Sequence, residues 1–221
     1  MAVRKLYGIV SSTDTMRALA SLFEHELEFE FIPLDLKAKA SHHNYDPILS
    51  LSPFGQLLVF QDGDLTLLES RTIMRFISHK YGKPGKEQVY LVPKQQGIAA
   101  TWIDVEDHQF DPPASKLRDE LVEKTRNGLP TDETVVAEEE DKLIEILDVY
   151  EERLSNSKYL GGDRFTSADL THLPNLYYLT GASVTVKHLF DERPHVRAWC
   201  TTILSRPAWI KVVETVQKIV D

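Results

Sequence analysis

The sequence predicts a small domain of strands and helices followed by a larger domain made only of helices. Alternation of apolar and polar residues, which is typical of strands, is found only before the segment Gly82-Lys83-Pro84-Gly85, where glycine and proline mark a linker. Beyond it apolar residues recur at helical spacing, most clearly from Thr131 to Leu154. We therefore expect one domain at 1–82, a linker at 83–92 and an all-helical domain at 93–221.

The first domain is expected to contain a mixed four-stranded sheet with helices packed on it. The apolar run Lys5–Val10 predicts a strand, Arg17–His25 a helix, and the alternation in Leu27–Phe31 a second strand with one buried face. Asp62-Gly63 between two apolar segments predicts a β-hairpin, because glycine adopts positive φ without steric cost. A helix over Ser70–Tyr81 completes the order βαβ, loop, ββα.

The second domain is expected to be helical throughout. The predicted helices cover 97–108, 131–154, 172–178, 195–204 and 208–220. The acidic run Glu138–Asp141 is interpreted as a solvated helix face. Thr166 and Asp169 have the spacing of a capping box, which predicts a role in folding and none in catalysis.

Composition excludes several functional classes. The net charge of −9 over 221 residues argues against a general nucleic-acid binder. The single cysteine, Cys200, cannot form an intrachain disulfide and fits a reducing compartment. Neither a signal peptide nor a long apolar span is evident, so we expect a cytoplasmic protein without a membrane partner.

A first candidate for chemistry lies where the first strand meets the first helix. Ser11 and Ser12 occupy this junction, and Thr13, Asp14 or Thr15 can cap the helix. A hydroxyl here lies near unpaired N–H groups and the positive end of the helix dipole, where it can stabilise an anion such as a ligand thiolate. A plain turn or capping role for Ser12 is the alternative that the residues alone leave open.

A second candidate is the stretch Ser52–Ile73, which is expected to form a loop, a tight hairpin and the opening of a helix. Glu69 offers a carboxylate to a ligand ammonium group, and Ser70 offers a hydroxyl and a backbone N–H to a ligand carboxylate. The corner could therefore hold a small charged peptide. No paired-cysteine metal motif and no glycine-rich phosphate loop are present, so neither a metal nor a cofactor is expected.

Together these segments resemble the soluble glutathione S-transferases, and within them the plant phi class. Each motif is weak alone, but as a set they are specific and span almost the whole chain. They are Ser52–Gln56, Asp62–Leu65, Glu69–Ile73, Val105–Pro112, Thr131–Glu133, Val135–Lys142, Leu147–Glu151, Tyr159-Leu160, Phe165–Asp169 and His172–Pro174.

The resemblance implies a thioredoxin-like N-terminal domain, an all-α C-terminal domain and a homodimer. It implies an enzyme of EC type 2.5.1.18 that uses glutathione as cosubstrate, conjugates it to hydrophobic electrophiles and has a possible peroxidase side activity on organic hydroperoxides. Ser12 falls at the catalytic serine of the phi class, where its hydroxyl would favour the glutathione thiolate.

Further residue roles follow from the same resemblance. The implied glutathione contacts are His43, Asn44, Gln56, Leu57, Glu69 and Ser70. The implied acceptor pocket, between the domains, uses Ser11, Thr13, Phe110 and Leu117, and Phe54 is the implied anchor in the dimer interface.

The chain departs from the family pattern at Leu58, where the family has a cis-proline. A cis bond before a residue other than proline costs about 3–4 kcal/mol, against about 0.5–1 kcal/mol before proline. We therefore expect a trans or displaced loop and weakened glutathione binding. Asn44, an implied glutathione contact, replaces a frequent lysine. Asp119 and Glu123 replace aromatic residues that are frequent in the acceptor region, and this pair favours a less apolar acceptor site.

Three functions compete at this point. They are an active transferase or peroxidase, a weakly catalytic carrier of small molecules (a ligandin), and a structural partner domain like those attached to translation factors. The enzyme is favoured over the structural domain by the retention of Ser12, His43, Gln56, Glu69 and Ser70. Leu58 favours the carrier. Cys200 lies far from the strand-to-helix junction, which argues against the cysteine-based reductases of the superfamily.

Overall fold

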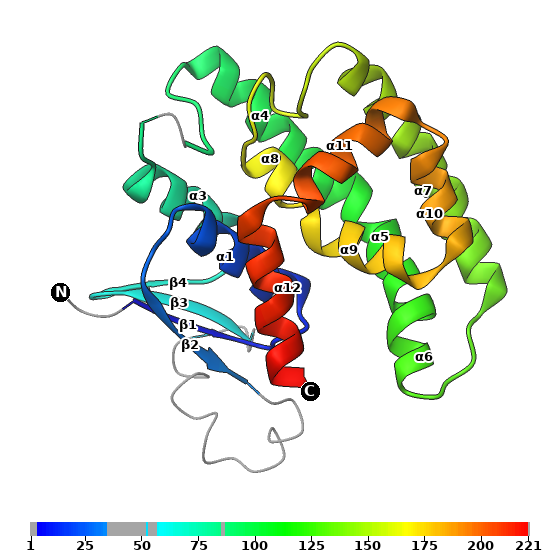
Figure 1. Ribbon diagram of the computed structural model, residues 1–221, viewed down its shortest axis with the longest axis horizontal. Coiled ribbons are helices and arrows are strands. Elements are labelled where there is room, and N and C mark those ends of the chain that lie inside the picture. The colour runs from blue at the N-terminus through cyan, green and yellow to red at the C-terminus, as the bar shows by residue number, and fades with distance from the viewer. Residues whose placement is uncertain (1–3, 35–51, 53–56, 85–86, 221) are drawn as a thin grey trace. The chain divides into compact units, whose positions relative to one another are not determined.

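The computed structural model describes residues 4–34, 52, 57–84 and 87–220 (Figure 1). The chain forms two compact units. Unit 1 joins the N-terminal part, up to Glu87, with the C-terminal segment from Pro207, and unit 2 comprises Gln88–Arg206. The last helix, predicted within the second domain, is therefore grouped with unit 1 because it packs against the first helix.

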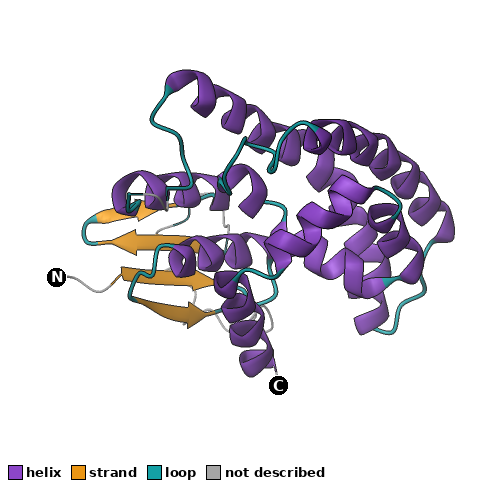
Figure 2. Cartoon of the chain, turned by 45° about the horizontal axis from the view of Figure 1, so that its top comes forward, coloured by secondary structure: helices purple, strands orange, loops and turns teal. Residues whose placement is uncertain are grey.

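The described strands of unit 1 form one four-stranded sheet, and they lie side by side in Figure 2. The strands are β1 (Arg4–Gly8), β2 (Phe29–Pro33), β3 (Leu58–Asp62) and β4 (Leu65–Leu67). In the order β2-β1-β3-β4, β1 is parallel to β2, whereas the β1–β3 and β3–β4 pairs are antiparallel. Gly63 turns the β3–β4 hairpin at φ 67°, so the mixed sheet and its hairpin are confirmed.

Three helices lie in the described residues of unit 1. They are α1 (Thr13–Glu24), α3 (Ser70–Tyr81) and α12 (Pro207–Val220). Helix α1 contacts both of the others and buries Met16, Leu19 and Leu22 completely. Helix α3 has the predicted bounds, but α1 begins four residues earlier than Arg17, and β1 ends at Gly8 instead of Val10.

Gly8 allows the close approach of β1 and α1. A Cβ at this position would lie 2.4 Å from the Thr15 Oγ1 atom, which is closer than van der Waals contact permits. The missing side chain lets the chain turn directly from the sheet into α1, and this brings the segment around Ser12 to the end of β1.

In the described residues of unit 2 the regular elements are helices, as predicted, apart from an isolated β-bridge between Tyr159 and Gly162. Its helices are α4 (Pro93–Val105), η3 (Glu106–Phe110), α5 (Asp111–Arg118), η4 (Asp119–Glu123), α6 (Lys124–Arg126), α7 (Glu133–Ser155), α8 (Ser167–Leu170), α9 (Leu173–Ala182), α10 (Val184–Asp191) and α11 (Pro194–Leu204). The segments η3 and η4 are π-helical turns. Because η3 and α5 follow α4 without a break, the helical segment continues past the predicted end at His108. The π turn η3 directly precedes α5, whose prolines lack N–H donors.

The core of unit 2 is an aromatic cluster with a polar centre. The Tyr150 hydroxyl lies 2.8 Å from the His172 Nε2 atom, and the Phe110 ring stacks on Tyr150. Asp169 is completely buried beside them and accepts a hydrogen bond from the Trp199 indole N–H at 3.0 Å. The predicted capping box of Thr166 and Asp169 is confirmed.

The acidic run on α7 is only partly the solvated face that was predicted. Glu139 is 2% exposed and binds Lys116 of α5 at 2.7 Å and Lys142 of α7 at 2.8 Å. Burial disfavours its charged form, but the two lysine hydrogen bonds outweigh burial and hold the pKa of Glu139 below its ordinary value. Glu139 thus joins two helices, whereas its neighbours Glu138 and Asp141 are exposed.

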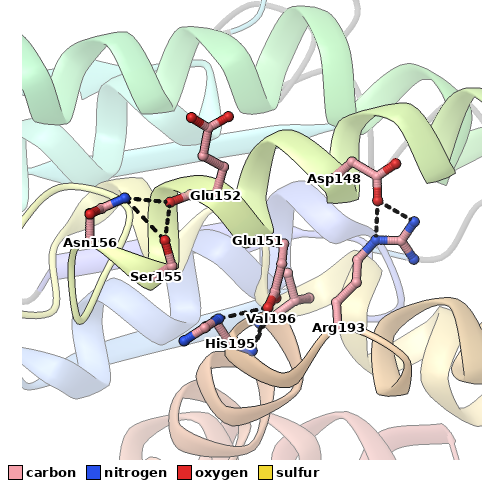
Figure 3. A network of polar contacts seen from close by, with 8 residues as sticks. All are labelled: Asp148, Glu151, Glu152, Ser155, Asn156, Arg193, His195 and Val196. Atoms are coloured by element: carbon pink, nitrogen blue, oxygen red, sulfur yellow. Dashed lines mark hydrogen bonds and ion pairs between the residues drawn. The ribbon is translucent and has the colours of Figure 1, made fainter.

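A second carboxylate of α7 caps the start of α11 (Figure 3). Glu151 accepts hydrogen bonds from the backbone N–H groups of His195 and Val196 at 3.0 and 2.9 Å, and from the His195 Nδ1 atom at 2.6 Å. Burial opposes ionisation, yet these donors hold the pKa of Glu151 below its ordinary value. One turn earlier, Asp148 binds the guanidinium of Arg193 at 2.6 Å.

We expect Glu151→Gln to lower the free energy of unfolding by about 1–2 kcal/mol at pH 7, because α11 loses a charged cap at its N-terminus. A lowered folded-state pKa stabilises the fold above the ordinary value of 4.5 and ceases to do so as pH falls below it. The difference between variant and wild type in the free energy of unfolding, measured by urea titration, should therefore shrink toward pH 3.

Glu152→Gln is the matched control, since Glu152 is exposed and uses only its backbone carbonyl to accept bonds from Ser155 and Asn156. An equal loss in both variants would show that the cap contributes nothing specific.

Candidate active site

Ser12 is the residue that opens α1. It has extended backbone angles, its N–H donates to the Ile9 carbonyl at 3.0 Å, and its carbonyl accepts from Met16 N–H at 3.0 Å. Its hydroxyl makes no capping hydrogen bond. The expectation that Thr13, Asp14 or Thr15 caps the helix is therefore wrong, and the half-buried Ser12 hydroxyl lies at the positive end of the helix dipole without serving the helix itself.

Ser70 is the first residue of α3 and is 2% exposed. Its hydroxyl donates to the Asp14 Oδ1 atom at 2.6 Å, and the same oxygen accepts from the Arg17 Nη1 atom at 3.1 Å. One carboxylate of α1 therefore connects the openings of two helices. The sequence suggested only a capping role for Asp14. Its place as an acidic residue in the first turn of a helix was the one feature of the sequence that could have drawn attention to it.

Glu69 has a left-handed backbone conformation, with φ 65° and ψ 115°. Among the described residues, Glu26 is the other non-glycine residue with positive φ. Such a conformation costs about 1–3 kcal/mol and persists where the surrounding structure enforces it, often at a functional site. Here it directs the chain from the β4 end into α3, whose Ile73 N–H bonds the Glu69 carbonyl at 2.9 Å.

These residues line one cavity, which belongs entirely to unit 1. Its volume is about 260 Å³, and its described lining consists of Ile9, Ser12, Asp14, Leu57, Leu58, Glu69 and Ser70. Four residues predicted to bind glutathione or act on it, namely Ser12, Leu57, Glu69 and Ser70, thus come together. The described lining contains two carboxylates and no lysine, arginine or histidine.

Leu58 is the first residue of β3 and pairs with Gly8 of β1. The described residues include no cis peptide bond, so the Leu57–Leu58 peptide is trans. A trans bond is what the high cost of the cis form before leucine favours. Where Leu57 and Leu58 line the cavity, the backbone therefore follows a trans path, which a cis-proline at position 58 would change.

The other predicted site residues do not reach this cavity or cannot be placed. His43, Asn44, Gln56 and Phe54 lie outside the described residues. Ser11 and Thr13 flank Ser12 in the chain but are absent from the described lining.

Two residues predicted to line the acceptor pocket are buried core residues. Phe110 and Leu117 are 0% exposed, and Phe110 packs against Tyr150 and His172. Their contribution to an acceptor pocket stays a prediction.

The polar residues expected near the acceptor are engaged in local ion pairs. Asp119 binds Arg118 at 3.2 Å and Glu123 binds Arg126 at 3.3 Å. Cys200 is buried in α11, as predicted, and burial raises the pKa of its thiol. A raised thiol pKa disfavours the thiolate that a cysteine-based reductase needs.

Neither a metal centre nor a membrane segment is found in the described part of the chain. Its histidine, cysteine and acidic side chains form no group of three or more that could hold a metal ion. None of its helices is long and apolar enough to cross a membrane.

Comparison with known families decides the identity. Residues 2–79 match the model of the glutathione S-transferase N-terminal domain, and residues 108–207 match that of the C-terminal domain. The chain belongs to the glutathione S-transferase family. The sheet of unit 1 is accordingly that of the thioredoxin-like domain of this transferase, and the helices of unit 2 form the C-terminal domain of the glutathione S-transferase fold.

Individual relatives place the transferase with the plant phi class. A glutathione S-transferase of Hyoscyamus muticus is 50% identical over 210 residues, which are 95% of this chain and 97% of the relative. Glutathione transferase F2 from Populus trichocarpa, whose crystal structure is known, has 37% sequence identity to this chain and a TM-score of 0.90. The match covers 97% of this chain and 99% of that one. Glutathione S-transferase I from maize, solved with an atrazine glutathione conjugate, is 32% identical with a TM-score of 0.87, over 98% of this chain and 99% of that one.

Proposed function

We propose that this transferase binds glutathione in the cavity of unit 1 and that the Ser12 hydroxyl stabilises its thiolate. The observation that carries the proposal is a serine hydroxyl at the N-terminus of α1 that does not cap the helix and faces the same cavity as Glu69 and Ser70. A relative of this chain has been solved with a glutathione conjugate, which supports the assignment of the ligand.

The proposed reaction is nucleophilic attack by the glutathione sulfur. Ser12 donates its O–H to the sulfur and favours the thiolate over the thiol, so that the serine itself is never the nucleophile. Lowering a thiol pKa by about two units requires roughly 2.7 kcal/mol of differential stabilisation. A hydrogen bond to a charged group, together with a helix N-terminus, supplies an energy of this order. The thiolate then attacks an electrophilic carbon and displaces the leaving group, or reduces an organic hydroperoxide.

The remainder of the tripeptide is assigned to groups around the same cavity. Glu69 binds the γ-glutamyl ammonium group, Ser70 binds the γ-glutamyl carboxylate, and Leu57 contributes its backbone. His43, Asn44 and Gln56 are proposed contacts that lie outside the described residues. Homodimerisation through Phe54 and a cytoplasmic location remain predictions from the sequence.

Capture on immobilised glutathione, followed by assays with a generic aryl halide and with cumene hydroperoxide, tests the proposal. Retention together with turnover of either substrate is the expected result. A folded protein that is neither retained nor turns over either substrate would instead support the carrier function. The trans Leu57–Leu58 peptide favours that alternative, because it keeps the loop from the family's cis arrangement.

We expect Leu58→Pro to lower the Michaelis constant for glutathione several-fold. Proline reduces the cost of a cis bond from about 3–4 to about 0.5–1 kcal/mol, which makes the family loop accessible. Leu58 is the first residue of β3, a position where a strand tolerates proline. Steady-state kinetics at saturating acceptor measure the change, and an unchanged or higher constant contradicts the idea.

A further inference from the structure

We propose that Asp14 is a specificity-determining residue. Its carboxylate accepts the hydrogen bond of the Ser70 hydroxyl, which would otherwise be donated to the γ-glutamyl carboxylate of glutathione. This inference rests on the function proposed above. It assigns to Asp14 an effect on ligand affinity in place of a role in the chemical step.

The contact between the two side chains is short and uses a single donor. Ser70 Oγ lies 2.6 Å from Asp14 Oδ1, which is the distance of a charge-assisted O–H···O⁻ bond. A serine hydroxyl has one proton to donate. It cannot donate to Asp14 and to a ligand carboxylate at once, so a carboxylate ligand must displace Asp14 or forgo this hydrogen bond.

Asp14 is held in place by a second partner. Arg17 Nη1 lies 3.1 Å from the same oxygen of Asp14, and the Arg17 side chain is only 2% exposed, whereas that of Asp14 is 50% exposed. Turning Asp14 away from Ser70 would also disturb a hydrogen bond to a buried guanidinium, which is costly. The internal carboxylate is therefore a fixed competitor, and it remains accessible to a ligand.

The charge of the cavity adds to this effect. Asp14 and Glu69 both line it, and the described lining contributes no cationic side chain. An arriving carboxylate is repelled by Glu69 and by Asp14, whose charge Arg17 offsets in part, whereas an arriving ammonium group is attracted by both carboxylates. We infer that the site discriminates between the two charged groups of the γ-glutamyl end, favouring the ammonium and penalising the carboxylate.

Calorimetric titration of the full-length wild type, Asp14→Asn and Asp14→Ala with three peptides tests the inference. The peptides are glutathione, 4-aminobutanoyl-cysteinylglycine, which lacks only the γ-glutamyl carboxylate, and glutaryl-cysteinylglycine, which lacks only the ammonium group. Both variants should bind the glutaryl peptide about three- to tenfold more tightly, since one hydrogen bond is released and one repulsion removed. Glutathione should gain by a smaller factor, because its ammonium group loses the attraction of Asp14. Binding of the 4-aminobutanoyl peptide should not improve.

The sign of the change separates this role from a structural one. A residue that only supports α1 would weaken binding when replaced, whereas here the Michaelis constant for glutathione should fall while kcat stays constant. Asp64→Asn, at the exposed hairpin turn, is the matched control and should change neither value.

Other outcomes are equally informative. Weaker or unchanged glutathione binding in both variants overturns the inference, and a loss confined to the ammonium-bearing peptides would mean that Asp14 binds the ammonium group instead. If wild type and both variants bind none of the peptides, the proposed glutathione site fails with it. If the variants alone bind glutathione, the competition is stronger than stated and the inference holds.

Discussion

Replacing Ser12 with alanine is expected to lower kcat/KM for glutathione conjugation about ten- to a hundredfold at neutral pH. The proposed hydrogen bond supplies about one to two units of the lowered pKa of the bound thiol, and each unit lost reduces the thiolate fraction about tenfold while pH lies below that pKa. The α1 N-terminus, which belongs to the backbone, remains in the variant. Residual activity above the uncatalysed rate should therefore survive.

The pH profile distinguishes this mechanism from a loss of folding. The inflection that reports the thiol should move about one to two units toward alkaline pH, so the loss of rate in the variant should narrow as pH rises. Ser12→Thr retains a hydroxyl and should keep the wild-type inflection. Ser12→Ala should still be captured on immobilised glutathione, and an unshifted inflection with wild-type rates would assign thiolate stabilisation to the backbone alone.

Local patterns in the sequence predicted the scaffold of this site well. Asp62-Gly63 gave the hairpin, and helical spacing gave α3 with its observed bounds, because both signals come from residues close together in the chain. The start of α1 was missed, since several hydroxyl and acidic residues in succession can each cap a helix. The two glutathione-binding candidates of α3, Glu69 and Ser70, nevertheless reach the same cavity as Ser12.

Contacts between distant residues could not be predicted in this way. Asp14 and Ser70 are 56 positions apart, and Lys116 and Glu139 are 23 apart. An acidic run such as Glu138–Asp141 looks uniformly solvated until the lysine of another helix is placed beside it. The burial of Phe110 could not be predicted for the same reason, because it depends on rings that other helices supply.

Asp169→Ala is expected to be the most destabilising single substitution considered, at about 3–5 kcal/mol. The buried carboxylate accepts from the backbone N–H groups of Thr166 and Leu160, both at 2.9 Å, and from the indole of Trp199. Alanine leaves these buried donors unpaired and opens a cavity. Because a whole domain is stable by only about 5–15 kcal/mol, urea unfolding should begin at a much lower concentration.

Asp163→Ala is the matched control, since Asp163 is exposed six residues earlier in the chain, and it should change stability by less than about 0.5 kcal/mol. A similarly small effect at Asp169 would contradict the network described for the core.

The pH dependence of Asp169 gives a second and independent test. Burial raises its pKa from 3.8 to about 6, and the hydrogen bonds from Thr166, Leu160 and Trp199 oppose this rise without cancelling it. A raised folded-state pKa means that the folded protein retains a proton which the unfolded chain releases. The resulting stabilisation is complete below about pH 3.8 and is lost as pH rises through about 6. The side chain of Asp169→Asn cannot titrate. The difference in the free energy of unfolding between the wild type and this variant should therefore narrow between pH 4 and pH 7. A constant difference across that range would mean that the carboxylate stays charged in the core, held by its donors alone.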